Sequence, residues 1–354
     1  MKTLLSQQEI WTSGEAGYNT YRIPALTVSA SGTVLALCEG RKHSRSDAGT
    51  IELLLRRSTD SGVNWEPVQV VVAEAEMTCG NPCPVVDRTT GRIHLLFCKN
   101  LGNGPESMIC EGEAPRTVWY ACSDDDGLNW SEPMEITATT KREFWTWYAT
   151  GPGHGIQLES GRLVIPCDHM VGENLDRATD PYHSHVIISD DNGASWSIGG
   201  IVPEGTNECC IIEAADGSLY INCRNYRGEK RRAAARSTDA GESFPERYWE
   251  DGLPEPICQG SMVTHTADSS ASNRVLFANP ASQEERAALT LRLSEDGGRS
   301  WAQSRCLYKG PSAYSDLAVA PDGMALCLYE RGADDPYEHL TLARIHPDWI
   351  CESD

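Results

Sequence analysis

Short apolar runs that each follow a small or polar turn dominate the pattern of hydrophobic and polar positions along the chain. Turn residues such as Gly, Asn or Asp before β-branched and apolar residues are typical of a hairpin that enters a strand. No helical periodicity of comparable length competes with these runs. The pattern therefore predicts six strands, whose turns end at Gly32, Gly91, Gly161, Gly217, Asn273 (after Ser272) and Gly323, and whose first apolar residues are Val34, Ile93, Leu163, Leu219, Val275 and Met324.

A second repeat, Ser-x-Asp-x-Gly-x-x-Trp, alternates with the first. Four copies begin at Ser58, Ser123, Ser189 and Ser294, and a fifth copy, from Ser237, ends in Phe244. In such a box, called an Asp box, the Asp accepts backbone N–H groups, the Gly adopts a positive φ and the aromatic residue packs beneath the turn. The box is a structural device, so it indicates a fold and not an activity.

The two repeats together predict the architecture. One turn-and-strand and one box recur about every 55 residues, which is enough for four short strands in each unit. Six units of this kind predict an all-β fold, a six-bladed β-propeller. Because blades close into a ring, the whole chain of residues 1–354 is expected to form a single domain.

The charge of the chain excludes some classes of partner. The formal net charge is −21, which repels phosphate backbones and anionic lipid surfaces, so we expect neither a nucleic-acid partner nor insertion into a membrane. The first residues, MKTLLSQQEIW, lack the apolar stretch of a secretory signal, and no run of apolar residues is long enough to span a bilayer. These features predict a cytoplasmic protein, and they leave its oligomeric state open.

The fourteen cysteines are expected to be buried thiols. Cys38, Cys98 and Cys327 lie inside apolar runs, where a free Cys packs as a small hydrophobic residue. The Cys79/Cys83 pair has no second pair at the spacing of a zinc site. The sequence therefore predicts no metal and no other cofactor.

The segment Tyr21-Arg22-Ile23-Pro24-Ala25-Leu26, followed by several Asp boxes, resembles the exo-sialidases (neuraminidases) of the bacterial and vertebrate cytosolic type. The resemblance extends from about residue 10 to about residue 340. It implies a six-bladed propeller, in agreement with the repeats, and it implies sialylated glycans or free sialosides as partners. It is also carried by Asn81-Pro82-Cys83-Pro84, Gly151-Pro152-Gly153-His154, Ala313-Tyr314-Ser315-Asp316-Leu317 and Leu328-Tyr329-Glu330.

The resemblance implies three arginines that bind the carboxylate of the sugar, Arg22, Arg224 and Arg286. Guanidinium groups suit this task because they bind a carboxylate in bidentate geometry and stay charged. Arg292, two residues before an Asp box, is the competing candidate, and we expect it to face outward along a strand. Arg41 is expected to add positive charge, and Gln259 is a further residue expected to bind substrate.

The resemblance also implies the catalytic residues. A carboxylate nucleophile would be repelled by the carboxylate of the sugar, whereas a neutral phenol is not. Tyr314 is therefore the expected nucleophile and Glu208 the base that takes its proton. Asp47, in a polar loop, is the expected acid and base, and Glu330 is expected to brace Arg22.

One stretch departs from the vertebrate cytosolic pattern. Pro166-Cys167-Asp168-His169-Met170 lacks the tyrosines expected near the glycerol tail of the sugar. The sugar could thus be N-acetylneuraminate, or Kdn (deaminated sialic acid) or another 2-ulosonic acid, and His169 could be a pocket donor or an ordinary loop residue. The same fold would also suit a trans-sialidase or a non-catalytic carbohydrate-binding propeller. The sequence leaves linkage preference and any calcium dependence open.

Overall fold

The computed structural model describes residues 4–172, 182–265 and 273–351, and this part of the chain is almost entirely β-structure. Ser272, the first residue of the fifth predicted turn, lies outside the described residues. Within these ranges, no helix combines the length and the apolar composition needed to cross a bilayer. The three helices are short: α1 (Glu106–Cys110), α2 (Thr137–Thr140) and α3 (Pro347–Cys351).

The first half of the chain forms an eight-stranded sheet and a five-stranded sheet. The larger has the order β2-β3-β4-β6-β7-β8-β9, with β5 paired to β4, and its only parallel contact within the described residues joins Ile51 to Thr78. The smaller has the order β10-β12-β13-β14, with β11 paired to β12. The strands are β2 (Thr20–Val28), β3 (Val34–Arg41), β4 (Ile51–Ser58), β5 (Gln69–Val72), β6 (Met77–Val86), β7 (Ile93–Leu101), β8 (Arg116–Ser123), β9 (Met134–Glu135), β10 (Trp145–Thr150), β11 (Ile156–Gln157), β12 (Leu163–Val171), β13 (Tyr182–Ser189) and β14 (Ser197–Ile201).

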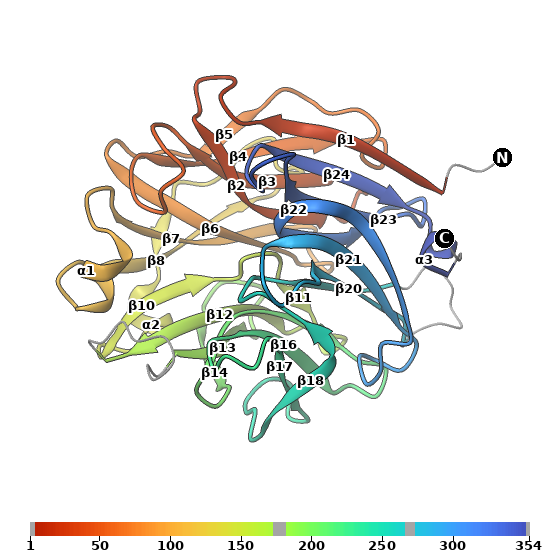
Figure 1. Ribbon diagram of the computed structural model, residues 1–354. Helices are drawn as coiled ribbons and strands as arrows, with labels where there is room; N and C mark the ends of the chain where they lie inside the picture. The colour runs from red at the N-terminus through yellow and green to blue at the C-terminus, as the bar shows by residue number, and fades with distance from the viewer. Residues whose placement is uncertain (1–3, 173–181, 266–272, 352–354) are drawn as a thin grey trace.

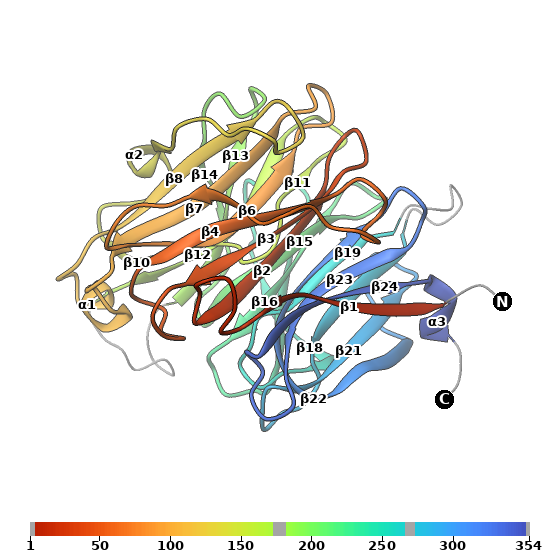
Figure 2. The same cartoon turned by 90° about the horizontal axis from the view of Figure 1, so that it is seen from above.

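The second half forms a four-stranded sheet, β15-β16-β17-β18, and a seven-stranded sheet, β1-β24-β23-β22-β21-β20-β19. The N-terminal strand thus pairs with the last strand of the chain, and both views show β1 beside β24 (Figures 1 and 2). The strands are β1 (Leu5–Thr12), β15 (Thr206–Glu213), β16 (Leu219–Asn225), β17 (Arg231–Ser237), β18 (Arg247–Pro254), β19 (Ser261–Thr264), β20 (Val275–Pro280), β21 (Ala287–Ser294), β22 (Gln303–Val319), β23 (Ala325–Arg331) and β24 (His339–Ile345).

The six predicted strand starts are confirmed. They open β3, β7, β12, β16, β20 and β23, and the last of these begins one residue later than predicted, at Ala325. Almost all residues of these strands are buried, because neighbouring sheets cover both of their faces. This burial explains why the runs are continuously apolar instead of alternating.

The five Ser-x-Asp-x-Gly-x-x-aromatic turns have the predicted internal hydrogen bonds. In the first, the Ser58 hydroxyl donates to Asp60, and the N–H of Asn64 donates to the same carboxylate at 2.8 Å. The N–H of Gly62 donates to the Ser58 hydroxyl, and the φ of Gly62 is +83°. A Cβ at Gly62 would lie 2.9 Å from the side chain of Leu342 in β24, so this turn needs glycine for contact as well as for conformation.

The hydrophobic core lies between neighbouring sheets. One cluster, for example, joins Leu26 and Val34 of β2 and β3 to Leu326 and Leu342 of β23 and β24. The predicted burial of Cys38, Cys98 and Cys327 is confirmed, but the expectation fails for Cys122 and Cys306, which are half-buried, and for Cys351, which is exposed. Within the described residues, no group of three His, Cys, Asp or Glu side chains is arranged to hold a metal ion.

Candidate active site

Side chains from all four sheets line one pocket. Strands β2, β3, β6 and β8 of the eight-stranded sheet meet β10 and β12, β15 and β16, and β22 there, together with α1 and loop residues. The site is therefore assembled from segments far apart in the sequence. The lining residues are Arg22, Ile23, Glu39, Arg41, Asp47, Thr78, Asn81, Glu106, Arg116, Trp147, Ala149, Asp168, Asn207, Glu208, Arg224, Tyr226, Arg286 and Tyr314.

An irregularity in β2 lies at Arg22. The register with β3 shifts between Arg22 and Ala25, and Ile23 has a φ of +58°, which is rare for a β-branched residue. Pro24 follows and cannot donate to the ladder, so it fits a bulge better than a regular strand. Bulges re-aim side chains next to functional sites, and here the bulge accompanies a guanidinium in the pocket wall.

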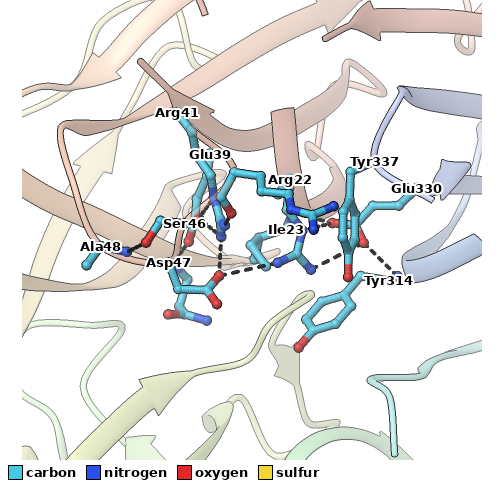
Figure 3. A network of polar contacts seen from close by, with 12 residues as sticks. Arg22, Ile23, Glu39, Arg41, Ser46, Asp47, Ala48, Tyr314, Glu330 and Tyr337 are labelled. Atoms are coloured by element: carbon cyan, nitrogen blue, oxygen red, sulfur yellow. Dashed lines mark hydrogen bonds and ion pairs between the residues drawn. The ribbon is translucent and has the colours of Figure 1, made fainter. Parts of the chain in front are cut away.

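Glu330 stabilises this bulge through hydrogen bonds. Its fully buried carboxylate accepts hydrogen bonds from Arg22 Nε at 3.1 Å and Nη2 at 3.4 Å (Figure 3). It also accepts the backbone N–H of Ile23 and that of Tyr314, each at 3.0 Å. The contact with Arg22 has the geometry predicted for a brace, and the same carboxylate fixes the backbone at Tyr314.

Tyr314, Glu208 and Arg224 form a closed set of contacts. The Tyr314 hydroxyl donates to Glu208 Oε1 at 2.6 Å. Arg224 Nη1 donates to Glu208 Oε2 at 2.6 Å and to the Tyr314 oxygen at 3.0 Å. Burial and the neighbouring Glu208 raise the pKa of Tyr314 well above its usual value, against the opposing effect of Arg224. The phenol is therefore protonated at rest, with a carboxylate in place to receive its proton.

Asp47 lies in the loop between β3 and β4, and its side chain is 65% exposed. Its Oδ1 pairs with Arg41 Nη2 at 2.7 Å and with Arg22 Nη1 at 3.3 Å (Figure 3). Partial removal from water raises the pKa of Asp47, but the two guanidiniums outweigh this effect, so the pKa lies below its usual range. Arg41 is also paired with Glu39, at 2.7 Å.

Arg286, and not Arg292, lines the pocket. Arg286 Nη1 donates to the Tyr337 hydroxyl at 2.8 Å, and within the described part of the chain its guanidinium pairs with no carboxylate. Arg292 lies in β21 and donates to Asn279 at 2.8 Å. It is only 6% exposed, so the expectation that it faces outward was wrong: its strand is covered on both sides.

Gln259 is not among the lining residues. It is fully buried, and its amide bonds to the backbone of Pro152 and to both the N–H and the carbonyl of Ser315. All of these contacts anchor backbone, including the residue after Tyr314. The geometry thus places Gln259 outside the pocket lining, where it holds β22.

Comparison with known proteins identifies the family. A model of the BNR repeat-like domain matches residues 32–327. Sialidase-3 of Mus musculus is 32% identical over 410 residues, which cover 99% of this chain and 96% of the relative. The chain belongs to the sialidase family of glycoside hydrolases.

Two further members extend the likeness. The sialidase of Micromonospora viridifaciens is 32% identical over 96% of this chain, which spans about half (54%) of that relative. The solved Hadza microbial sialidase Hz136 superimposes with a TM-score of 0.86 at 28% identity, over 97% of this chain and 69% of that structure. The resemblance drawn from the Tyr-Arg-Ile-Pro segment is thereby confirmed at the level of the family.

Sequence reasoning missed several lining residues that this sialidase-family site contains. Arg116 packs over the Trp147 ring, with 4.3 Å between its Cζ and the ring centroid, and it also bonds to the side chain of Asn81. Trp147 and Tyr226 bring aromatic side chains to the pocket. The aromatic-rich WTWY segment and the Tyr two residues after Arg224 were signals for them.

The departing stretch, residues 166–170, is divided between the two faces of β12. Asp168 lines the pocket. His169 does not: it lies in a buried cluster, stacked on Trp145 with ring centroids 3.5 Å apart, and its Nδ1 is 3.0 Å from that of His185. His169 is therefore neither a pocket donor nor a loop residue, because alternate residues of a strand point to opposite faces.

Proposed function

We propose that this protein is an exo-acting, retaining α-sialidase that removes terminal sialic acids from sialylated glycans through a tyrosine-linked glycosyl-enzyme. The observation that carries the proposal is the 2.6 Å hydrogen bond from the Tyr314 hydroxyl to Glu208, beside three pocket arginines. Sialidase relatives at about 30% identity support sialic acid hydrolysis in general. The roles of the individual residues are part of the proposal.

Substrate binding rests on Arg22, Arg224 and Arg286, whose guanidiniums would hold the carboxylate of the sugar. Arg22 and Arg224 form ion pairs with Glu330 and Glu208, which fix their orientation. The charge of Arg286 is available for the substrate, because no carboxylate among the described residues pairs with it. An anion bound among fixed guanidiniums needs little reorganisation of the protein. The net charge of −21 does not oppose this, since distant surface carboxylates are screened within about 10 Å at 0.1 M salt.

In the first step, Glu208 accepts the phenolic proton while Tyr314 Oη attacks the anomeric carbon. Asp47, in its protonated form, gives its proton to the glycosidic oxygen as the bond from that oxygen to the anomeric carbon breaks. The exposed loop that carries Asp47 suits a group that must meet leaving groups of different shape. A tyrosine nucleophile also avoids placing a second negative charge beside the carboxylate of the sugar.

In the second step, the Asp47 carboxylate takes a proton from water, whose oxygen attacks the anomeric carbon. The bond to Tyr314 Oη breaks, and Glu208 returns the proton to the phenol. Two successive inversions give net retention at the anomeric carbon. Gln259 and Glu330 would act as positioning residues, since both hold the backbone around Tyr314.

We further infer that the sheets constitute six blades of one propeller domain. Three features support this inference: the six turn-and-strand repeats, the pairing of β1 with β24, and the length of β22, which pairs with β21 in its first part and with β23 in its second. The succession of colours around Figure 1 agrees with a ring of blades. Residues from four sheets would then meet where the blades converge.

Hydrolysis of paired fluorogenic α-glycosides of N-acetylneuraminate and Kdn tests the activity. We expect turnover of the first, with release of the α-anomer seen by NMR before mutarotation. A preference for Kdn would retain the mechanism but change the sugar. Transfer to lactose in place of release to water would identify a trans-sialidase. Activity on neither glycoside would refute the proposal.

A further inference from the structure

The mechanism assigns no task to the carboxyl group of Asp168. Its residue is fully buried in β12 and lines the pocket. Oδ1 accepts hydrogen bonds from Trp147 Nε1 at 3.1 Å and from Asn207 Nδ2 at 2.8 Å. Oδ2 has no hydrogen-bond partner among the described residues.

An orphaned carboxyl oxygen at this depth is costly. Leaving one buried polar atom unsatisfied costs about 1–3 kcal/mol, and more if it is charged. Native structures satisfy the great majority of such atoms, so an exception in a ligand pocket points to the ligand. The two donors on Oδ1 also fix the orientation of the carboxyl group, and Oδ2 has no competing hydrogen-bond partner among the described residues.

The surroundings of Asp168 favour the neutral form. Burial raises its pKa well above the usual value, and Glu208 adds to the increase, against the opposing effects of Arg116 and Arg224. A protonated carboxyl is a hydrogen-bond donor at one oxygen and an acceptor at the other. With Oδ1 occupied as an acceptor, the O–H is left at Oδ2.

Asp168 and its two partners lie on other strands than Arg22 and Arg286, whereas Arg224 is near enough to affect the pKa of Asp168. The partners Trp147 and Asn207 belong to β10 and β15, and Arg22 and Arg286 come from β2 and the segment before β21. A sugar whose carboxylate lies among the arginines has its uncharged substituents left for the β10–β12–β15 side. Trp147 adds an aromatic side chain to that side, with Arg116 packed over its ring.

We propose that Asp168 is a specificity-determining residue, whose Oδ2 donates a hydrogen bond to an uncharged polar substituent of the bound sugar. The candidate acceptors are the acylamino group and a hydroxyl of the glycerol side chain, and the experiment distinguishes them. The proposal rests on the proposed sialidase function, because the same pocket is used. Asp168 thereby takes the place of the tyrosines that residues 166–170 lack.

The test compares the Asp168→Leu and Asp168→Asn variants on three fluorogenic glycosides: that of N-acetylneuraminate, its deaminated analogue, and an analogue with a shortened glycerol side chain. We expect Asp168→Leu to lower kcat/KM for the first about 10- to 100-fold, the range for a lost pocket hydrogen bond. The loss should shrink to less than about threefold on the analogue that lacks the acceptor. Asp168→Asn should stay within about threefold of wild type, since its amide N–H donates from the position of Oδ2.

An equal loss of kcat/KM on all three glycosides would overturn the proposal, because it means a structural role. An unchanged kcat/KM in Asp168→Leu would also overturn it, as would an Asp168→Asn variant that is as impaired as Asp168→Leu. His169→Gln, the next residue on the opposite face, controls for disturbance of β12. If Asp168→Leu fails to fold, the pH profile of kcat/KM for Asp168→Asn decides, because a neutral Asp168 predicts an unchanged profile and the loss of a limb contradicts it.

The experiment can distinguish failure of the proposed sialidase function from failure of the role proposed for Asp168. If the wild-type protein hydrolyses none of the glycosides, the proposed function fails, and binding of free N-acetylneuraminate, deaminated and shortened sugars is measured by thermal shift. Weaker stabilisation of Asp168→Leu than of wild type on only the sugars that carry the acceptor, with Asp168→Asn close to wild type, would support the role of Asp168. An identical pattern in wild type and variant would overturn it.

Discussion

The Tyr314 hydroxyl lies 2.6 Å from Glu208 Oε1, although 106 residues separate the two in the chain. They come from β22 and β15, and Arg224 bonds to both. The short contact places a proton acceptor on a phenol whose pKa is raised by burial and by Glu208. The proposed nucleophile is thus neutral before the reaction, which suits the anionic substrate of the proposed function.

Replacing Tyr314 with Phe is expected to lower kcat by at least about three orders of magnitude, because losing a covalent nucleophile costs more than about 4 kcal/mol of transition-state stabilisation. The aromatic packing stays, so the melting temperature should change little. Tyr329→Phe is the matched control: it removes another buried hydroxyl, bonded to Gln7 at 2.8 Å, outside the pocket. Turnover by Tyr314→Phe equal to that of the control would refute the nucleophile.

Glu330→Gln should impair both stability and activity. A Gln amide would direct N–H groups at Arg22 and at the Tyr314 N–H, which are themselves donors, and breaking such a buried pair costs about 3–5 kcal/mol. We expect a lower midpoint in urea unfolding and a lower kcat/KM for the folded fraction.

Glu255→Gln separates these two effects. Glu255 forms an equally buried pair with Arg232 at 2.7 Å, outside the pocket lining. It should lose stability alone. Equal kcat/KM values for the two folded variants would contradict a positioning role for Glu330.

We expect Arg286→Ala to reduce activity and Arg292→Ala to reduce stability. The first removes an unpaired pocket guanidinium, so kcat/KM should fall about 100-fold or more, the range for a lost charged partner. The second removes the contact with Asn279 and should affect stability, while kcat/KM remains within about threefold of wild type. Steady-state kinetics with urea unfolding measures both, and a larger kinetic loss in Arg292→Ala would reverse the assignment.

The pH dependence of kcat/KM should follow the protonation of Asp47. Asp47 must carry a proton to act as an acid, and Arg41 and Arg22 lower its pKa against the opposing effect of burial. The rate constant should therefore decline as the pH rises through that pKa. Arg41→Gln removes one positive charge, so the pKa of Asp47 should rise and the descending limb should move to higher pH.

Arg45→Gln is the control for this shift. The Arg45 guanidinium pairs with Asp335 at 2.7 Å on the surface and makes no ion pair with Asp47 among the described residues. The descending limb of the pH profile of Arg45→Gln should coincide with that of wild type. An unmoved limb in Arg41→Gln would argue against Asp47 as the group that sets it.

Much of the fold was predictable because its signals are local. A Gly-containing turn and the apolar run after it lie within ten residues, and each Ser-x-Asp-x-Gly turn closes its hydrogen bonds over four residues. The family resemblance selected Arg286 over Arg292, and Arg286 lies in the pocket. The outward orientation expected for Arg292 failed, because the covering of β21 by neighbouring sheets leaves no local trace in the sequence.

By itself, the sequence determined the strands, the turns and the chemical groups of the site, because turn geometry and hydrophobic runs act over short stretches of chain. Only the tertiary structure decided which groups face the pocket. The contact of Glu330 with the bulge at Ile23 and the contact of Asn207 with Asp168 join residues from different sheets. The raised pKa of Asp168 and the available charge of Arg286 follow from that packing, since burial and neighbours, and not residue type, set them.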